Sequence, residues 1–318
     1  FPQGRFRAHA KDKMMNFSQL TPPDYAKYRH YFENQRYELC AYSLASIIAW
    51  SNNEYKPYGA EYEDAFIVAA EFTEEKQNRH LLLPISPERM FSPEELVDVA
   101  RLAEHRQYWF VPQDYIDHFG QALVERYFTI KHHAAYDDYV YRAQDLAELK
   151  GNRYSKKRNL INQFRREYDG TERVSIEPIA ADNAEACMVF LEEWCQERDC
   201  DADDQFDLAC EKQAAINTLV HYDAFDLKGI LLRIDGKVCA FGISAPLTTD
   251  MATLQYEKAL GSIKGLYQYF DNACARMLFN GYTYLNKESD MGIPGLTKAK
   301  KSYYPEKMVH SVRLILND

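Results

Sequence analysis

Hydrophobic residues in the second half of the chain change their spacing several times, and each change predicts a new element. Apolar residues at helical spacing between Cys187 and Trp194 predict a helix. Two apolar runs, residues 229–234 and 237–243, flank Asp235 and Gly236, a pair that favours a type I′ turn, and they predict a β-hairpin. The pattern then predicts a third strand at residues 252–259, a helix from Gly265, a short strand at 282–286, a helix near Pro294 and a last strand at 308–316.

The first half carries a weaker pattern of the same kind. Ser92, Pro93 and Glu95 match the N-cap, first position and capping-box glutamate of a helix. The remaining pattern predicts strands at residues 64–72, 80–86, 107–112 and 126–133 and a helix at 113–123. Because the halves share an order of elements but little sequence, they indicate a duplicated unit. We therefore predict an α/β protein with mixed sheets and two units, residues 14–150 and 171–318, joined by a basic helix at 151–170. The second unit is expected to carry the main cleft.

Composition excludes several other classes of protein. A chain of 318 residues with 46% hydrophobic residues can form a packed core in two domains, and its net charge of −10 disfavours general binding to nucleic acids or anionic membranes. The longest apolar stretch, Cys40 to Trp50, is too short and too polar to span a bilayer.

The cysteine pattern and the N-terminus bear on compartment and on metal binding. Seven cysteines at irregular spacing are typical of reduced thiols, so we expect a cytoplasmic protein without a metal site. The chain begins with Phe1 and has no signal-peptide pattern, so we expect the natural protein to start at Met14 or Met15, with residues 1–13 foreign to it.

A basic segment separates the two halves. Lys150 to Arg166 contains seven Lys or Arg residues and no acidic residue, while Leu160, Ile161 and Phe164 form an apolar stripe. The segment is either a solvated connecting helix or a face that binds phosphate. On the second interpretation, the residues that contact the anion are Lys156, Lys157, Arg158 and Asn159.

Four stretches resemble one known family. "LKGNRYSKKRN", "LQYEKA", "KGLYQYF" and "LNKESDMGIPGLTKAKKSYYPEK" are similar to motifs of the C-terminal domain of bacterial phosphatidylglycerol lysyltransferases. The resemblance implies a tandem GNAT-type acyltransferase fold, related to the Fem aminoacyltransferases. It also implies transfer of an aminoacyl group from a charged tRNA, although many relatives have no known activity. The chain departs from the family where it has Asn286-Lys287-Glu288 for Asn-Arg-Glu and Gly295-Leu296-Thr297 for Gly-Leu-Arg, which removes a bidentate anion binder.

The last of these stretches contains the candidate catalytic residues. Acyl transfer needs a base for the attacking group and a cation or N–H donor for the oxyanion. Glu288 and Asp290 follow a strand end and are candidate bases. Lys258 must be exposed, paired with a carboxylate such as Glu288, or catalytic, and we expect pairing first. Further residues expected to contact substrate or an anion are Gly265, Tyr267, Asn286, Gly292, Gly295, Lys298, Lys300 and Ser302, with Glu211 and Glu257 as additional candidates.

The sequence leaves the acyl donor open. Acetyl-CoA enzymes of this fold hold pyrophosphate on a glycine-rich loop before a helix, and residues 261–267, "GSIKGLY", occupy the matching place with Tyr267 where a small residue is usual. We expect no tightly bound cofactor, and a donor that is either an aminoacyl-tRNA, held by the basic segment, or an acyl-CoA. A third alternative is a protein that keeps the fold and binds a small molecule without chemistry.

Overall fold

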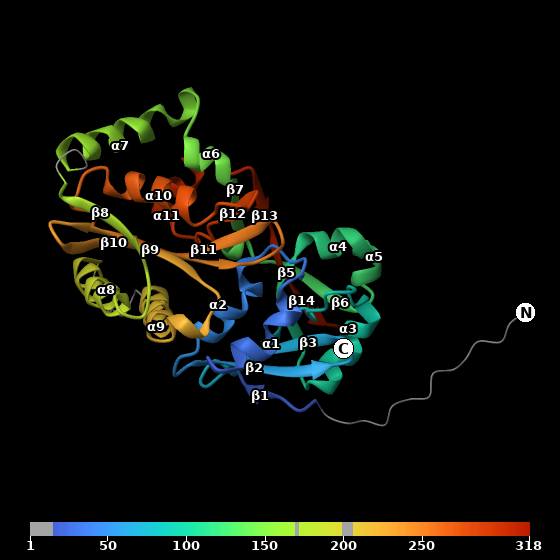
Figure 1. The fold of residues 1–318 in the computed structure, drawn as a ribbon. Coiled ribbons are helices and arrows are strands. Elements are labelled where there is room, and N and C mark those ends of the chain that lie inside the picture. Colours follow the sequence, from blue (N-terminus) through green and yellow to red (C-terminus); the bar gives the residue numbers. More distant parts are fainter. Residues whose placement is uncertain (1–14, 169–171, 199–205) are drawn as a thin grey trace, which may run out of the picture.

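The computed structural model describes residues 15–168, 172–198 and 206–318, which form two seven-stranded mixed sheets flanked by helices (Figure 1). Residues 1–13, and residues 169–170 of the predicted connecting helix, lie outside the described part. The first sheet and its helices comprise Ser18–Gln19 (β1), Asp24–Phe32 (α1), Leu44–Ala49 (α2), Tyr55–Tyr62 (β2), Ala65–Phe72 (β3), His80–Leu81 (β4), Pro93–Leu102 (α3), Gln107–Pro112 (β5), Gln113–Phe119 (α4), Gln121–Val124 (α5), Phe128–His132 (β6) and Ser311–Leu316 (β14).

The second sheet and its helices account for most of the remaining chain. They comprise Asp138–Arg142 (β7), Ala143–Glu148 (α6), Ser155–Glu167 (α7), Val174–Pro178 (β8), Ala184–Arg198 (α8), Phe206–Val220 (α9), Lys228–Ile234 (β9), Lys237–Pro246 (β10), Met251–Ala259 (β11), Leu266–Met277 (α10), Tyr284–Asn286 (β12), Pro294–Lys301 (α11) and Lys307–Val309 (β13). No helix among residues 15–168, 172–198 and 206–318 is long and apolar enough to cross a membrane.

The two sheets match strand by strand. Their orders are β1-β2-β3-β4-β5-β14-β6 and β8-β9-β10-β11-β12-β7-β13. In both orders the fourth and fifth strands pair in parallel, and every other neighbouring pair is antiparallel. Since all six pairings agree in direction, the two units have the duplicated architecture that the order of elements predicts.

The units exchange one strand each. β7 belongs to the first half of the sequence but pairs with β12 and β13, while the C-terminal β14 returns to the first sheet between β5 and β6 (Figure 1). The sheets therefore differ from the predicted units 14–150 and 171–318 at these two strands. Local hydrophobic pattern cannot assign a strand to one sheet or the other, because it records only which face of the strand is buried.

The two crossover segments lie side by side. The Asp137 carboxylate accepts from the Ser311 backbone N–H at 2.8 Å and contacts His310 Nδ1 at 2.7 Å, and the His133 N–H donates to the Ser311 carbonyl at 2.9 Å. One carboxylate thus connects the entry of β7 to the entry of β14, which fixes how the two sheets meet.

Local signals in the sequence explain the best-predicted elements. Asp235 and Gly236 have φ of 51° and 81°, and a type I′ turn requires positive φ at both positions. The Ser92 hydroxyl accepts from the Glu95 N–H at 3.3 Å, and the Glu95 carboxylate accepts from the Ser92 N–H at 2.8 Å, which completes the capping box. Both predictions are confirmed.

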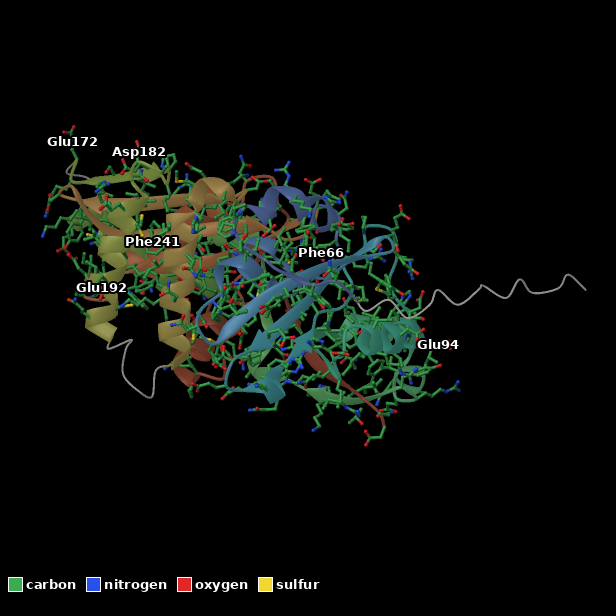
Figure 2. The ribbon with its side chains drawn as sticks, turned by 90° about the horizontal axis from the view of Figure 1, so that it is seen from below. Phe66, Glu94, Glu172, Asp182, Glu192 and Phe241 are labelled. Carbon is green, nitrogen blue, oxygen red and sulfur yellow. The ribbon has the colours of Figure 1, made fainter. Side chains whose placement is uncertain are left out.

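Helices cover both faces of the second sheet. α6, α7 and α10 pack together on one face, whereas α8 and α9 pack on the other (Figure 1). Alternate residues of β10 accordingly enter two different cores, Ala240 with Phe270 and Phe241 with Phe190. Figure 2 shows Phe66 and Phe241 inside the two units, with the acidic residues Glu94, Asp182 and Glu192 at the periphery.

Gly265 is required for packing of α10 against α7. Its φ is 81°, and a Cβ at this position would lie 2.2 Å from the Leu160 carbonyl oxygen. Gly236 has the same φ, but its Cβ would meet no atom within 4 Å. We expect Gly265→Ala to lower the free energy of unfolding by at least about 2 kcal/mol more than Gly236→Ala, because only the first substitution adds a backbone clash to the strain. Urea denaturation of both variants measures this difference, and equal losses would contradict it.

Candidate functional site

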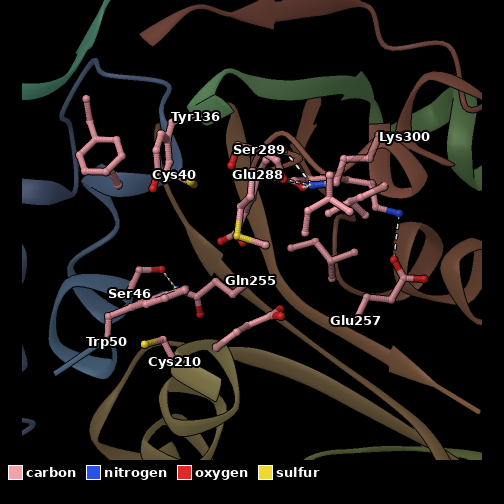
Figure 3. Close-up of a pocket in the computed structure, with 18 of the residues that line it drawn as sticks. Cys40, Ser46, Trp50, Tyr136, Cys210, Gln255, Glu257, Glu288, Ser289 and Lys300 are labelled. Atoms are coloured by element: carbon pink, nitrogen blue, oxygen red, sulfur yellow. Dashed lines mark hydrogen bonds and ion pairs between the residues drawn. The ribbon is translucent and has the colours of Figure 1, made fainter. Parts of the chain in front are cut away.

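A large cavity lies between the two sheets. Its volume is about 1140 Å³, and residues of both units line it. The first unit contributes mainly apolar side chains, among them Val68, Ala70 and Leu82, whereas the second contributes charged ones from β11, from the segment that follows β12 and from helices α7, α9, α10 and α11. In Figure 3, Glu288, Ser289 and Lys300 lie across the cavity from Ser46, Gln255 and Cys210. The cavity is therefore apolar toward one unit and ionic toward the other.

The turn after β12 holds Glu288 in an unusual conformation. Glu288 has φ of 59°, a value that non-glycine residues rarely adopt. The Lys300 ammonium, which comes from α11, donates to the carbonyl oxygens of Lys287 at 2.5 Å, Glu288 at 3.1 Å and Ser289 at 2.5 Å. One half-buried cation thus donates to three consecutive carbonyls and holds the backbone of the turn at Glu288.

A second set of hydrogen bonds supports the same turn from β12. The Asn286 side-chain oxygen accepts from the Glu288 N–H at 2.6 Å, and its amide nitrogen donates to the Asp138 carboxylate at 2.8 Å. Asp138 also accepts from the Cys40 backbone N–H at 2.6 Å. Asp138 and Asn286 are buried, so this chain links the first unit to Glu288 through groups shielded from water.

Burial perturbs the acid–base behaviour of the site. It raises the pKa of the Glu288 carboxyl to about 8, although the charge of Lys300 opposes the rise. Burial lowers the pKa of Lys300, and the charge of Glu288 opposes that change. A carboxyl group that titrates near neutral pH inside a cavity is suited to accept a proton from a bound nucleophile.

Asp290, the other candidate base, does not line the cavity. It accepts hydrogen bonds from the Tyr139 hydroxyl at 2.6 Å and the Gly292 N–H at 3.0 Å. Burial raises the pKa of Asp290, but hydrogen bonds from Thr297, Tyr139 and Gly292 outweigh this effect and lower it overall. Asp290 therefore stabilises the turn through its hydrogen bonds, and Glu288 is the better candidate base.

The lysines of the cavity wall form ion pairs with three carboxylates, of which the sequence singled out Glu211 and Glu257 but not Asp271. Lys258 contacts Glu211 at 2.7 Å, so its expected pairing with a carboxylate is confirmed, with Glu211 in place of Glu288 as the partner. Lys287 contacts Glu257 at 2.9 Å and Asp271 at 2.7 Å. Burial raises the pKa of Glu257 to about 7, with Asp271 adding to the rise and Lys287 opposing it.

The other candidates divide into those at the cavity and those elsewhere. Tyr267, Gly295 and Lys157 line it, and the Lys157 ammonium donates to the Ser302 hydroxyl at 2.7 Å. Arg158 instead donates to the carbonyls of Leu149 and Gly151 and closes the end of α6. Lys156, Asn159, Gly265, Gly292 and Lys298 do not line the cavity.

Several residues of the site lie outside every motif recognised in the sequence. Asp138, Cys40 and Asp271 come from segments remote from the final motif, and each is buried or half-buried in contact with it. The sequence offered one signal for Asp138, namely a carboxylate on a predominantly apolar strand. Because buried charges are rarely unpaired, such a residue is expected to have a specific partner. Within the described residues no group of three or more His, Cys, Asp or Glu is arranged to hold a metal ion.

The duplicated sheet order, with a parallel pair at the centre of each sheet, defines an α/β protein built from two units of the same mixed-sheet topology. The family model for "Phosphatidylglycerol lysyltransferase, C-terminal" matches residues 35–311, and the chain belongs to this family. Membership of this lysyltransferase family indicates an acyltransferase. None of the curated proteins matches the chain.

Solved structures similar to this chain include two bacterial proteins of the same size. A conserved protein of unknown function from Bacteroides thetaiotaomicron is 27% identical, with a TM-score of 0.85 over 96% of this chain and 100% of its own. The C-terminal domain of a lysylphosphatidylglycerol synthetase from Agrobacterium fabrum is 15% identical, with a TM-score of 0.59 over 87% of this chain and 88% of its own. At 15% identity the second likeness concerns the fold.

Proposed function

We propose that this protein transfers an aminoacyl group from an aminoacyl-tRNA to an acceptor held in the cavity between the two sheets. The observation that carries the proposal is the half-buried Glu288 carboxyl in the cavity wall, with its pKa raised to about 8. Glu288 takes the proton of the attacking amine or hydroxyl as the new acyl bond forms and the bond to the tRNA ribose breaks. Lys258 and Lys287 are cations that line the same cavity, and their ion pairs hold them in place.

The geometry of α10 favours this donor over acyl-CoA. Pyrophosphate of CoA would need the backbone N–H groups at the start of a helix. Gly265 at the start of α10 is instead buried against the Leu160 carbonyl of α7. Gly265 is therefore explained by the close packing of α10 on α7. This removes the main reason for interpreting residues 261–267 as a pyrophosphate-binding loop.

A pocket on α7 is a candidate site for the phosphates of the donor. Arg158, Arg165 and Arg276 line a cavity of about 210 Å³ between α6, α7 and α10, together with Asn162, Asn272 and one acidic residue, Glu148. Guanidinium groups suit phosphate because they donate in a planar fork. On a chain with net charge −10, this pocket supports the phosphate-binding interpretation of the basic segment.

Salt dependence of tRNA binding tests this donor. Arg165→Gln combined with Arg276→Gln should weaken binding of total charged tRNA and flatten the slope of log affinity against log salt by about 1 to 2, since each lost phosphate contact removes close to one unit. The matched control, Arg101→Gln with Arg126→Gln, makes the same change in charge on the first unit and should leave the slope unchanged. An equal effect of both pairs would contradict the proposed site.

Transfer itself is tested with labelled aminoacyl-tRNA and two acceptors. Vesicles containing phosphatidylglycerol represent the acceptor in the family's name, and soluble primary amines represent the alternative. Label that moves to either acceptor supports the proposal and identifies the acceptor class. If only acetyl-CoA transfers its acyl group, the CoA-dependent N-acyltransferase alternative replaces it. If no donor reacts but ligands still bind, the chain is a binding protein with this fold.

A further inference from the structure

A backbone irregularity in the first sheet turns two aromatic side chains into the cavity. Tyr108 pairs with Leu314 and Val111 pairs with Val312, so Trp109 and Phe110 together face the single residue Arg313. This arrangement is a β-bulge, and Phe110 within it has φ of 54°. In a regular strand these two residues would point to opposite faces, but here both line the cavity. Strained bulges of this kind often direct side chains at binding sites.

Arg313 has no anionic partner in this part of the cavity. Its guanidinium lies over the Trp109 ring, 3.6 Å from the centroid, and hydrogen bonds to the His133 ring. Among the ion pairs of the described residues none involves Arg313. Burial lowers the pKa of Arg313, which still leaves it charged at neutral pH.

The neighbouring groups do not neutralise this charge. Burial lowers the pKa of His80 to about 3 and that of His133 to about 4, so both rings are neutral. Glu54 and Glu75 line the same cavity, but Glu54 accepts from the backbone N–H groups of residues 74 and 75, and Glu75 accepts from the Asn78 side chain. Among the described residues, the guanidinium therefore faces the cavity with no carboxylate at ion-pairing distance.

A second donor lies beside the guanidinium. Trp109 is 7% exposed, its indole stacks on His80 with ring centroids 4.3 Å apart, and its Nε1–H has no hydrogen-bond partner in the described structure. A buried donor without a partner costs free energy, which a ligand acceptor would recover.

We infer that Arg313 and the Trp109 N–H bind an anionic group, a carboxylate or a phosphate, of a ligand whose apolar part lies against Val68, Ala70 and Leu82. Val68 and Ala70 lie on β3 of the same sheet, Leu82 directly follows β4, and all three line the same cavity. Phe110 and Tyr136, whose ring centroids are 5.4 Å apart, line the same cavity as Glu288. The subsite would fix one end of a substrate while the other end reaches the second unit.

Direct binding measurements test the subsite without any acyl donor, so their outcome is independent of the proposed transfer. The probes are octanoate, octyl phosphate and octanol, which share a chain and differ in the head group, titrated calorimetrically at constant ionic strength. Wild type should bind both anions about 10-fold or more tightly than octanol, because a charged hydrogen bond forms only with them. Whichever anion binds more tightly identifies the head group as carboxylate or phosphate.

Two substitutions separate charge from packing. Arg313→Gln should remove the preference for anions and leave octanol binding within about twofold, while Trp109→Phe, which keeps a ring but lacks the N–H, should weaken anion binding about 3- to 10-fold. Arg106→Gln, an exposed position on the same sheet, is the matched control and should change nothing. Equal affinity of wild type for all three probes, no binding of any probe, or uniform weakening by Arg313→Gln would each overturn the inference. If Arg313→Gln does not fold, unchanged anion binding by Trp109→Phe overturns it as well.

Discussion

Glu288→Gln should reduce the rate of acyl transfer by about 10²- to 10⁴-fold, the usual contribution of a general base. Gln keeps the shape of the side chain and its capacity to accept a hydrogen bond but cannot take a proton. The turn should survive the substitution, since its main supports are the Lys300 ammonium and the Asn286 side chain. Single-turnover transfer under saturating donor measures the loss, and circular dichroism confirms the fold.

The pH profile distinguishes a base from a structural residue. With the pKa of Glu288 near 8, the wild-type rate should rise with pH and level off above that value. Glu288→Gln should abolish this rise, whereas Asp290→Asn should preserve it, because Asp290 lies in the turn and not in the cavity wall. A variant at position 288 that retains the full rate and the same profile would remove Glu288 from the mechanism.

The pH dependence of the free energy of unfolding checks the raised Glu288 pKa independently of activity. The folded protein holds a proton on Glu288 up to about pH 8, whereas the unfolded chain releases it near pH 4.5. The stability contributed by the neutral carboxyl is therefore fully present below pH 4.5 and is lost as the pH rises through 8. Gln has no proton to lose. The substitution should therefore stabilise the protein relative to wild type at pH 9 by on the order of 1–3 kcal/mol and have little effect at pH 4.5.

The sequence predicted those parts of the fold that short-range chemistry determines. The Asp235-Gly236 hairpin, the capped helix at Ser92 and the alternation in β10 each depend on residues a few positions apart. The exchange of β7 and β14 depends on contacts between residues more than 100 positions apart, such as Ser311 with Asp137. No local pattern encodes such a pairing, which is why the unit boundaries and the strand assignment differ.

The site shows the same division. The last motif correctly placed Glu288 and Asn286 together, because they are neighbours in sequence. Lys258 was expected to pair with a carboxylate such as Glu288, and it does pair, but the partner is Glu211 of α9, which no local pattern places next to it. Nor could spacing show which lysine of α11 points inward, since Lys298, Lys300 and Lys301 lie on a short helix whose orientation is set by tertiary contacts.

Lys300→Met should destabilise the protein by about 3–5 kcal/mol, the cost of removing one partner from a buried charged network. The carbonyls of residues 287–289 would lose their common donor, and Met offers similar volume without a hydrogen bond. Lys298→Met on the same helix is the matched control. Lys298 is exposed and does not line the cavity, so its replacement should change the free energy of unfolding by no more than about 0.5 kcal/mol.

The same substitution should also change the chemistry of Glu288. The Lys300 charge opposes the upward shift in the Glu288 pKa, so its removal should move the inflection of the pH–rate profile further above 8. Urea denaturation at pH 6 and the pH dependence of transfer measure the two effects on one set of proteins. Lys300→Met and Lys298→Met with equal stability and superimposable pH profiles would show that the ammonium neither supports the turn nor tunes the carboxylate. A large loss of stability for Lys300→Met alone, with the inflection displaced upward, would establish both roles, because a defect in folding alone does not change the pKa of the surviving native protein.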